Sequence, residues 1–319
     1  METTLPQRSI GSFTVGAIGL GCMGMTWAYT TGGRDDERSL ATIHRALERG
    51  MTLIDTADVY GPFSNEELVG RALDGRRDEV VLATKVGLVV EDVATLRIGR
   101  DGSPEHVRQG IDASLRRLRT DRVDLYQLHR VDERVPVEET WAAMADTVAA
   151  GKARAIGMSE ATVEQLETAH AIHPVASVQS ELSIWTRDRL DDVLPWCREH
   201  GAAFIPFAPL GRGYLTGTIT AASFDDGDFR ARNPRFTREA LDANLAIVDR
   251  VRAVAERHGA TPAQVALAWA LAQGEQVVPI PGTTKPERID ENAGAATLAL
   301  TADDLAELDA VPAPVGERY

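Results

Sequence analysis

The sequence predicts an α/β protein of the (β/α)8 TIM-barrel class, folded as a single domain over residues 1–319 with a short N-terminal β-hairpin. Short apolar runs alternate with longer segments in which apolar residues recur every three or four positions, and the alternation continues along the chain. Several runs are apolar on both faces, which is typical of parallel strands covered by helices. Eight strand and helix units of this kind favour a closed barrel over an open sheet.

The expected strands and helices alternate regularly along the chain. Residues 8–16 (RSIGSFTVG) are expected to form the hairpin and to close the bottom of the barrel. The expected strands are 17–20, 52–55, 80–85, 123–129, 153–158, 176–179, 203–208 and 277–281. The expected helices are 36–50, 65–75, 103–118, 137–151, 162–172, 190–201, 238–259 and a helix that begins at Pro286. Several of these segments end in Gly, as helices often do.

The composition excludes several classes of protein. With 44% apolar and 26% charged residues, the chain has enough apolar residues for a packed core. A formal charge of −14 would repel nucleic acid and an anionic membrane surface, so neither is expected as a partner. Only Cys22 and Cys197 are present, the N-terminus lacks a secretory pattern, and no apolar run approaches the ~20 residues of a membrane span. We therefore expect a cytoplasmic protein.

Polar residues stand where three neighbouring strands should end. Asp55 ends the second strand, Tyr60 lies in the loop after it, Lys85 ends the third strand and His129 ends the fourth. In a barrel, chemistry takes place at the carboxyl ends of the strands, so these side chains should meet at one rim. Each residue alone also has a structural interpretation, as a helix cap, a loop-edge aromatic, a solvated strand end or a core histidine.

Taken together, the four residues suit the protonation of a carbonyl oxygen. Lysine is rare here, with three among 34 basic residues, and a buried Lys85 would need Asp55 as its counter-ion. A charged ammonium beside Tyr60 is expected to lower the pKa of the phenol and make it a general acid. A neutral His129 could donate an N–H to the substrate oxygen and orient the carbonyl.

Three segments, IDTADVYG, ATKVG and DLYQLHR, resemble the catalytic segments of the aldo-keto reductase family, and the likeness extends from about Ile18 to the final GERY. The resemblance implies the same eight-stranded barrel, and a reaction in which NADPH supplies hydride to a small aldehyde or ketone while Tyr60 supplies the proton. Details such as DTADVYG and ELSIWTRD look closest to the branch that includes bacterial and plant ketone and pyridoxal reductases. The resemblance does not fix the substrate, the preferred direction or the oligomeric state.

A phosphate site is expected after the eighth strand. Gly282, Thr283, Thr284 and Lys285 precede a helix entered through Pro286, and free N–H groups at a helix start bind anions. The family pattern places the 2′-phosphate of NADPH on Lys285 and Arg288, with Glu291 and Asn292 near adenine. Glu291 and Asn292 could equally be exposed polar residues of a helix.

The remaining cofactor contacts are implied by the resemblance. The G-x-G-x-x-G pattern at 19–24 is not followed directly by a helical segment, so we interpret it as a glycine-rich loop and not as a dinucleotide fingerprint. The implied contacts along the nicotinamide half of NADP(H) are Gly21, Cys22, Met23, Asp55, Ser159, Gln179 and Phe207, and those along the pyrophosphate are Pro209, Leu210, Gly211 and Gly213. Many relatives have Asn after the serine, where this chain has Glu160 with no assigned role.

The substrate side is less specific. Trp27 and Trp185 could form the wall of an apolar pocket together with Tyr60 and His129. The long insertion 216–236 is either a lid over the cofactor or a surface loop. Because only a short tail follows the last helical pattern, we expect an open site that accepts a broad range of carbonyls.

Of three alternative functions, two lack the sequence pattern that they require and one stays open. A short-chain dehydrogenase would need Tyr and Lys four residues apart, and no Y-x-x-x-K occurs. A metal-dependent hydrolase would need clustered ligands, and the strand ends supply one clear histidine, so no metal site is expected. An NADPH-binding, redox-sensing regulatory subunit with slow turnover stays open as an alternative.

Overall fold

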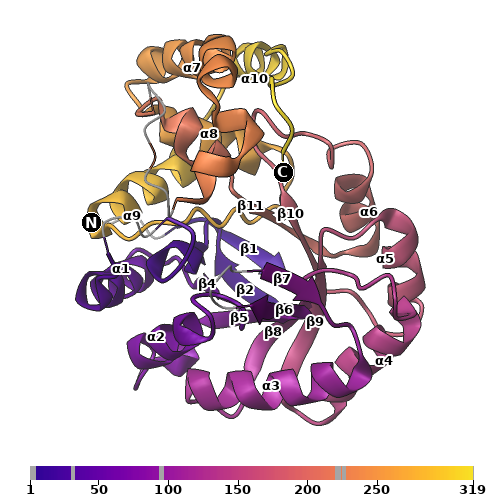
Figure 1. Cartoon of the computed structure of the whole chain (residues 1–319). Coiled ribbons are helices and arrows are strands. Elements are labelled where there is room, and N and C mark those ends of the chain that lie inside the picture. The colour runs from indigo at the N-terminus through magenta and orange to yellow at the C-terminus, as the bar shows by residue number, and fades with distance from the viewer. Residues whose placement is uncertain (1–4, 30–32, 93–96, 220–223, 225–227, 319) are drawn as a thin grey trace.

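The computed structural model describes residues 5–29, 33–92, 97–219, 224 and 228–318. Its main sheet is parallel and has the order β11-β10-β9-β8-β5-β4-β3, which curves into a barrel surrounded by helices (Figure 1). The strands are β3 (Leu20–Gly21), β4 (Leu53–Asp55), β5 (Val81–Val86), β8 (Val123–Leu128), β9 (Ala153–Ser159), β10 (Ser177–Glu181) and β11 (Ala203–Phe207). The predicted (β/α)8 barrel is confirmed.

The eighth strand of the barrel is an irregular extended segment. Residues 276–282 lie between β11 and β3, with the Val278 N–H donating to the Phe204 carbonyl (2.8 Å) and the Gly19 N–H donating to the Pro279 carbonyl (2.9 Å). Isolated bridges join Phe204 to Val277 and Gly21 to Gly282. Proline has no N–H, so Pro279 and Pro281 cannot complete a ladder. The segment therefore closes the ring although it does not qualify as a regular strand.

The predicted N-terminal hairpin is confirmed and closes one end of the barrel. Strands β1 (Gln7–Ile10) and β2 (Phe13–Gly16) pair antiparallel. Ile10 and Phe13 are buried against barrel residues, among them Leu53 and Ile205. The Arg8 guanidinium fixes the hairpin from the other side by donating to backbone carbonyls of residues 271, 274 and 277.

Most helices surround the sheet in chain order, whereas the seventh and the tenth lie outside the eighth (Figure 1). They are α1 (Asp36–Glu48), α2 (Ser64–Ala72), α3 (Pro104–Leu118), α4 (Val137–Ala149), α5 (Val163–His170), α6 (Val193–His200), α7 (Arg238–His258), α8 (Pro262–Ala272), α9 (Pro286–Gly294) and α10 (Ala302–Asp309). Many begin at side-chain caps such as Asp35, Ser103 and Thr162, which accept backbone N–H groups of the first turn. Within the described residues, no helix combines the length and apolar character needed to cross a membrane.

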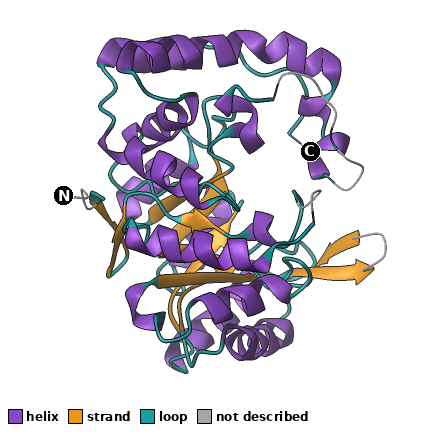
Figure 2. Ribbon diagram, turned by 90° about the vertical axis from the view of Figure 1, so that its left-hand side faces the viewer, coloured by secondary structure: helices purple, strands orange, loops and turns teal. Residues whose placement is uncertain are grey.

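A second hairpin marks the end of the barrel opposite the first. Strands β6 (Leu88–Asp92) and β7 (Arg97–Arg100) pair antiparallel directly after β5, and the sequence analysis did not predict them. Figure 2 shows this hairpin on the same side of the molecule as the C-terminus, whereas the N-terminal hairpin lies on the other side. The carboxyl ends of the parallel strands therefore open between β6–β7 and the C-terminal tail.

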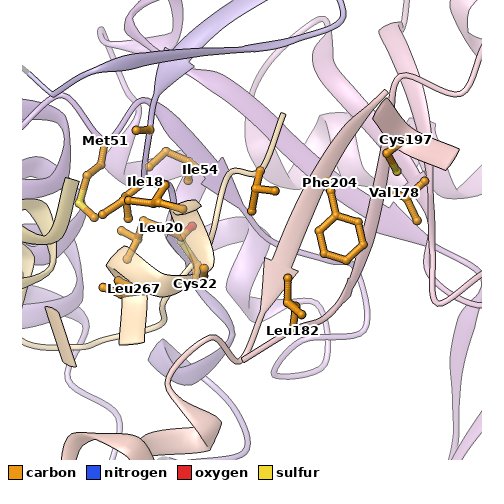
Figure 3. Close-up of a cluster of buried hydrophobic side chains, with 14 of the residues drawn as sticks. Ile18, Leu20, Cys22, Met51, Ile54, Val178, Leu182, Cys197, Phe204 and Leu267 are labelled. Carbon is orange, nitrogen blue, oxygen red and sulfur yellow. The ribbon is translucent and has the colours of Figure 1, made fainter. Parts of the chain in front are cut away.

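The larger hydrophobic core lies between the strands and the helices. Ile18, Leu20 and Met51 form one part of this cluster, and Val178 and Phe204 form another (Figure 3). A smaller cluster around Leu53, Val81 and Leu125 fills the interior of the barrel. Because the interior is filled, polar side chains are confined to the strand ends, where the candidate site lies.

Candidate active site

The four predicted catalytic residues come together at one rim. Asp55 ends β4, Tyr60 lies in the loop between β4 and α2, Lys85 lies near the end of β5, and His129 directly follows β8. The strands β4, β5 and β8 are neighbours, with Asp55 paired to Ala83 and Lys85 paired to Gln127. All four catalytic side chains are buried, and Lys85 has no exposed surface at all.

The Lys85 ammonium is the centre of the site. Its Nζ donates to Asp55 Oδ1 (2.6 Å), to the Thr56 carbonyl (2.9 Å) and to the Tyr60 hydroxyl (3.2 Å). An ammonium has three donors, and these three partners use all of them. A buried charge is tolerated when it is paired and hydrogen-bonded, so the geometry explains how a fully buried lysine is accommodated.

Two glutamines fix the other oxygen of Asp55. Oδ2 accepts Gln179 Nε2 at 2.8 Å and Gln127 Nε2 at 3.4 Å. Gln179 is expected to contact the nicotinamide, and here it also orients the catalytic carboxylate. Gln127 is absent from the sequence prediction, although it stands two residues before His129, and residues two apart in a strand share a face.

Two opposing effects set the pKa of Tyr60. Burial raises the pKa of Tyr60 above its ordinary value, and the Lys85 ammonium opposes this shift without cancelling it. Burial alone would lower the pKa of Lys85, but the attraction of Asp55 and Tyr60 raises it. Lys85 thus has the predicted lowering effect on the pKa of the phenol, but burial outweighs it, so the net shift is upward and not downward as expected. Tyr60 is held as a protonated phenol beside a permanent cation.

His129 is a neutral side chain with a free nitrogen. Its ring meets the Tyr60 ring edge-on, with the ring centroids 5.8 Å apart. Burial holds the pKa of His129 well below its ordinary value, and the charges of Lys85 and Arg130 lower it further. Nδ1 is buried and has no hydrogen-bond partner among the described residues. A buried nitrogen without a partner beside a phenol is a ready contact for a ligand oxygen.

The loop after β3 is tied to the catalytic loop by Asn65. Asn65 Nδ2 donates to the Cys22 carbonyl (2.9 Å) and the Thr26 hydroxyl (2.8 Å), and Asn65 Oδ1 accepts the Thr56 hydroxyl (2.7 Å). The Cys22 N–H donates to the Asp55 carbonyl at 2.9 Å. Only a three-residue 3-10 helix, Met23–Met25, follows the glycine pattern, in agreement with its interpretation as a loop. No sequence signal pointed to Asn65.

We predict that Asn65→Ala lowers the free energy of unfolding by about 1–3 kcal/mol, because it leaves buried polar groups on two loops without a partner. Denaturant unfolding measures the change. Glu67→Ala, at an exposed position of the same helix, is the control and should stay within about 0.5 kcal/mol of the unmodified chain. Equal stability of the two variants would contradict this role of Asn65.

The predicted cofactor residues lie around the same end of the barrel. Ser159 ends β9, and its hydroxyl accepts Arg130 at 3.0 Å. Gln179 lies on β10, and Phe207 ends β11. Pro209, Leu210, Gly211 and Gly213 follow β11 and enter the 3-10 helix Gly211–Thr216. Gly21 and Gly282 are joined by a backbone bridge, so the first and last loops of the predicted cofactor site are adjacent.

The predicted phosphate site lies at the start of α9. The N-cap is Lys285, which makes no side-chain cap, and Pro286 is the first helical residue. The Thr283 hydroxyl accepts the Lys285 N–H at 3.1 Å, so this threonine shapes the turn that precedes the helix. The side chains of Lys285 and Arg288 form no ion pair or hydrogen bond with the described residues. Glu291 and Asn292 lie one turn further along, and Asn292 is buried.

The two tryptophans occupy different environments. The Trp27 ring lies 5.9 Å from the Tyr60 ring, at the position expected of a substrate-pocket wall. Trp185 is 2% exposed and stacks on Tyr214, with the ring centroids 4.9 Å apart, so its main role in this structure is packing. The substrate-contact roles of both residues stay predictions.

The C-terminal tail reaches this end of the barrel although it is short. The Arg318 side chain pairs with Glu160 and Glu181, and its guanidinium lies 6.0 Å from the centre of the Phe207 ring.

The insertion 216–236, expected as a lid or as a surface loop, lies in part outside the described residues. Its described part includes Phe229, whose N–H donates to the Ala28 carbonyl at 3.1 Å, which joins the insertion to the loop after β3.

A (β/α)8 barrel with a buried Asp, Lys, Tyr and His set at the carboxyl ends of its strands defines a class of carbonyl oxidoreductase. The chain belongs to the aldo/keto reductase family, whose family model matches residues 17–313.

Individual relatives agree with this membership. The chain is 44% identical over 311 residues to probable aldo-keto reductase 1 of Glycine max, with 96% of this chain and 89% of the relative covered. It superposes on the glycerol dehydrogenase AKR11B4 from Gluconobacter oxydans with a TM-score of 0.87 and 33% identity, covering 95% of this chain and 94% of the other. The holo form of the aldo-keto reductase AKR11C1 from Bacillus halodurans gives a TM-score of 0.77 at 25% identity, with 95% of each chain covered.

Proposed function

We propose that this protein reduces small aldehydes or ketones to alcohols with NADPH, and that Tyr60 is the general acid. The observation that supports this proposal most directly is the Lys85 ammonium, which contacts both Asp55 and Tyr60 while His129 presents a free Nδ1 beside them. A buried proton donor next to a fixed cation suits a reaction in which negative charge develops on an oxygen.

Each side chain has one task in this mechanism. His129 donates an N–H to the carbonyl oxygen of the substrate and orients it toward Tyr60. The Tyr60 hydroxyl gives its proton to that oxygen as the carbonyl carbon is reduced, and Lys85 stabilises the phenolate that forms. Asp55 holds Lys85 in place and is itself held by Gln179. Bound NADPH would supply the hydride that reaches the carbonyl carbon.

The residues present fit a phosphorylated dinucleotide. The start of α9 has no side-chain cap, and Lys285 and Arg288 beside it are without partners in the described structure. Helix N-termini and basic side chains together bind phosphate, so Gly282, Thr283, Thr284, Lys285 and Arg288 would hold the 2′-phosphate. The loops at 21–23 and 207–213, with Ser159 and Gln179, would hold the nicotinamide half and the pyrophosphate. Glu291 and Asn292 would lie near adenine.

The absorbance of the nicotinamide tests the proposed function. Purified protein with NADPH is tested against a panel of aldehydes, ketones and pyridoxal, and the reverse reaction is tested with NADP⁺ and glycerol, because one structural neighbour is a glycerol dehydrogenase. Turnover of at least one carbonyl supports a reductase. Tight NADPH binding with very slow turnover of every carbonyl would instead support the redox-sensing subunit.

We also propose that the protein is cytoplasmic and that its substrate is a small molecule.

The preference for NADPH over NADH has its own test. Replacing both Lys285 and Arg288 with Ser should weaken NADPH binding about 10- to 100-fold and NADH binding far less, because charge-assisted contacts to phosphate contribute about 1.5–3 kcal/mol each when buried and less when exposed. Fluorescence titration measures both constants. Lys152→Ser, at the opposite end of the barrel before β9, is the control and should change neither constant. Equal losses for the two cofactors would contradict the assignment.

A further inference from the structure

Four charged side chains from separate parts of the chain meet beside the predicted nicotinamide position. We call Glu160, Glu181, Arg212 and Arg318 the rim network. Arg212 donates to Glu181 Oε2 at 2.9 Å, and Arg318 Nε lies 3.2 Å from the same oxygen. Arg318 also pairs with Glu160 through its NH2 group. Glu160 Oε1 in turn accepts the Glu181 N–H at 2.9 Å.

The rim network is buried, so its charges depend on one another. The Glu181 side chain is 1% exposed, the Arg212 side chain 7% and the Arg318 side chain 16%. Buried charges are tolerated when they are paired, and here the two carboxylates face the guanidiniums of Arg212 and Arg318, with Arg235 3.9 Å from Glu181 Oε1. Arg318 is the cation that contacts both carboxylates, so its loss would leave Glu160 and Glu181 without a shared counter-ion, and like charges at short range repel.

The network connects the segments that are expected to hold the cofactor. Glu160 directly follows Ser159, and Arg212 lies between Gly211 and Gly213 in the predicted pyrophosphate loop. Glu160 and Arg212 both have positive φ, 55° and 56°, which is uncommon for residues other than Gly. Strained backbone of this kind persists where surrounding contacts impose it. At Glu160 and Arg212, the contacts of the carboxylate and the guanidinium within the rim network hold the backbone in this conformation.

The C-terminal tail is fastened along its length before it reaches the network. Val315 and Asn244 exchange two hydrogen bonds, of 2.8 and 3.1 Å. The Gly316 carbonyl accepts Arg235 at 3.2 Å, and the Arg318 carbonyl accepts Asn233 at 2.8 Å. The backbone of the tail is thus held by α7 and by the 3-10 helices that precede it. The Arg318 side chain is held by the rim network.

We propose that Arg318 is a positioning residue of the cofactor site. By pairing with Glu160 and Glu181 it ties the C-terminal tail across the nicotinamide end, and through Glu181 it steadies Arg212 and the pyrophosphate loop. Arg212 lies in the loop predicted to cross the pyrophosphate, so we expect this tie to slow release of the cofactor. Glu160, at the position where many relatives have Asn, turns toward Arg318 and joins the tail to the barrel. This inference rests on the proposed binding of NADPH.

The test measures cofactor release in the full-length protein. NADPH dissociation is followed by fluorescence after rapid mixing with excess NADP⁺, and hydride transfer is followed in a single turnover. In Arg318→Gln we expect dissociation about tenfold faster, with a smaller change in the hydride-transfer rate. Glu160→Gln should act in the same direction, and the effect of the double variant, in free-energy terms, should be smaller than the sum of the two single effects. Arg318→Lys should restore part of the slow release because it keeps the charge.

One control variant and three possible results decide whether Arg318 has the proposed positioning role. Arg250 is an exposed residue of α7 that pairs with Glu307 of α10 and not with the rim network, so Arg250→Gln should leave dissociation unchanged. Release from Arg318→Gln at the rate of the unmodified protein would overturn the inference while leaving the proposed function intact. Fully additive effects in the double variant would also overturn it. Failure of the unmodified protein to bind NADPH would remove the proposed function and this inference together.

Discussion

Replacing Tyr60 with Phe is expected to lower the rate of carbonyl reduction by at least about 10²-fold, the usual contribution of a positioned general acid. The substitution removes one oxygen and keeps the ring that contacts His129 and Trp27. Binding of NADPH should persist, because none of the predicted phosphate contacts changes. The rate is measured by nicotinamide absorbance under single-turnover conditions, and binding by fluorescence titration.

The pKa shifts give this prediction a pH dependence. The pKa of Tyr60 is raised and the pKa of His129 is lowered, so between them the phenol is protonated and the imidazole neutral. The rate of reduction should therefore stay nearly constant from about pH 6.5 to 9 in the unmodified protein. A loss of activity centred near pH 6.5 would contradict a neutral His129, and a Tyr60→Phe variant with ordinary activity would remove Tyr60 from the mechanism.

Replacing Lys85 with Met is expected to reduce both activity and stability. The substitution leaves the buried Asp55 carboxylate without its cation, and removing one partner of a buried ion pair costs about 3–5 kcal/mol. It also removes the charge that stabilises the Tyr60 phenolate, so the rate should fall by at least about 10²-fold. Denaturant unfolding and the absorbance assay measure the two effects.

A double variant separates the two roles of Lys85. Combining Lys85→Met with Asp55→Asn removes both charges, so stability should recover in large part while activity stays low. Lys152→Met is the matched control, since Lys152 forms an exposed ion pair with Asp112 and should cost about 0–1 kcal/mol. Full activity in the Lys85 variant would refute the electrostatic role, and a double variant less stable than Lys85→Met would refute the ion-pair explanation.

The sequence predicts most of the barrel because its strands and helices have different periods. The segment at 277–281 is the instructive exception, since its apolar pattern is that of a strand while Pro279 and Pro281 prevent a complete ladder. Helix α8 has no polar face along most of its length, so the three-and-four spacing that identifies other helices is missing there. The β6–β7 hairpin follows β5 after a single glycine, and the sequence predicts no element there.

The predicted site shows a similar limit. Spacing and chain order are enough to bring Asp55, Tyr60, Lys85 and His129 together at the strand ends. The direction of the Tyr60 pKa shift depends on how completely the phenol is buried, which one sequence does not reveal. Asn65 and Arg318 contact residues that are distant in the chain, and the sequence around each of them does not predict these contacts.

The bridge between Gly21 and Gly282 has a consequence for the newly made protein. The loop at 21–23 is synthesised near the beginning and the phosphate loop at 282–285 near the end, and they become neighbours only when the segment 276–282 enters the ring. A ribosome must therefore release almost the whole polypeptide before a complete nucleotide pocket exists. A partly made chain that has all four predicted catalytic residues would still lack the loop that we propose for the adenosine half of NADPH.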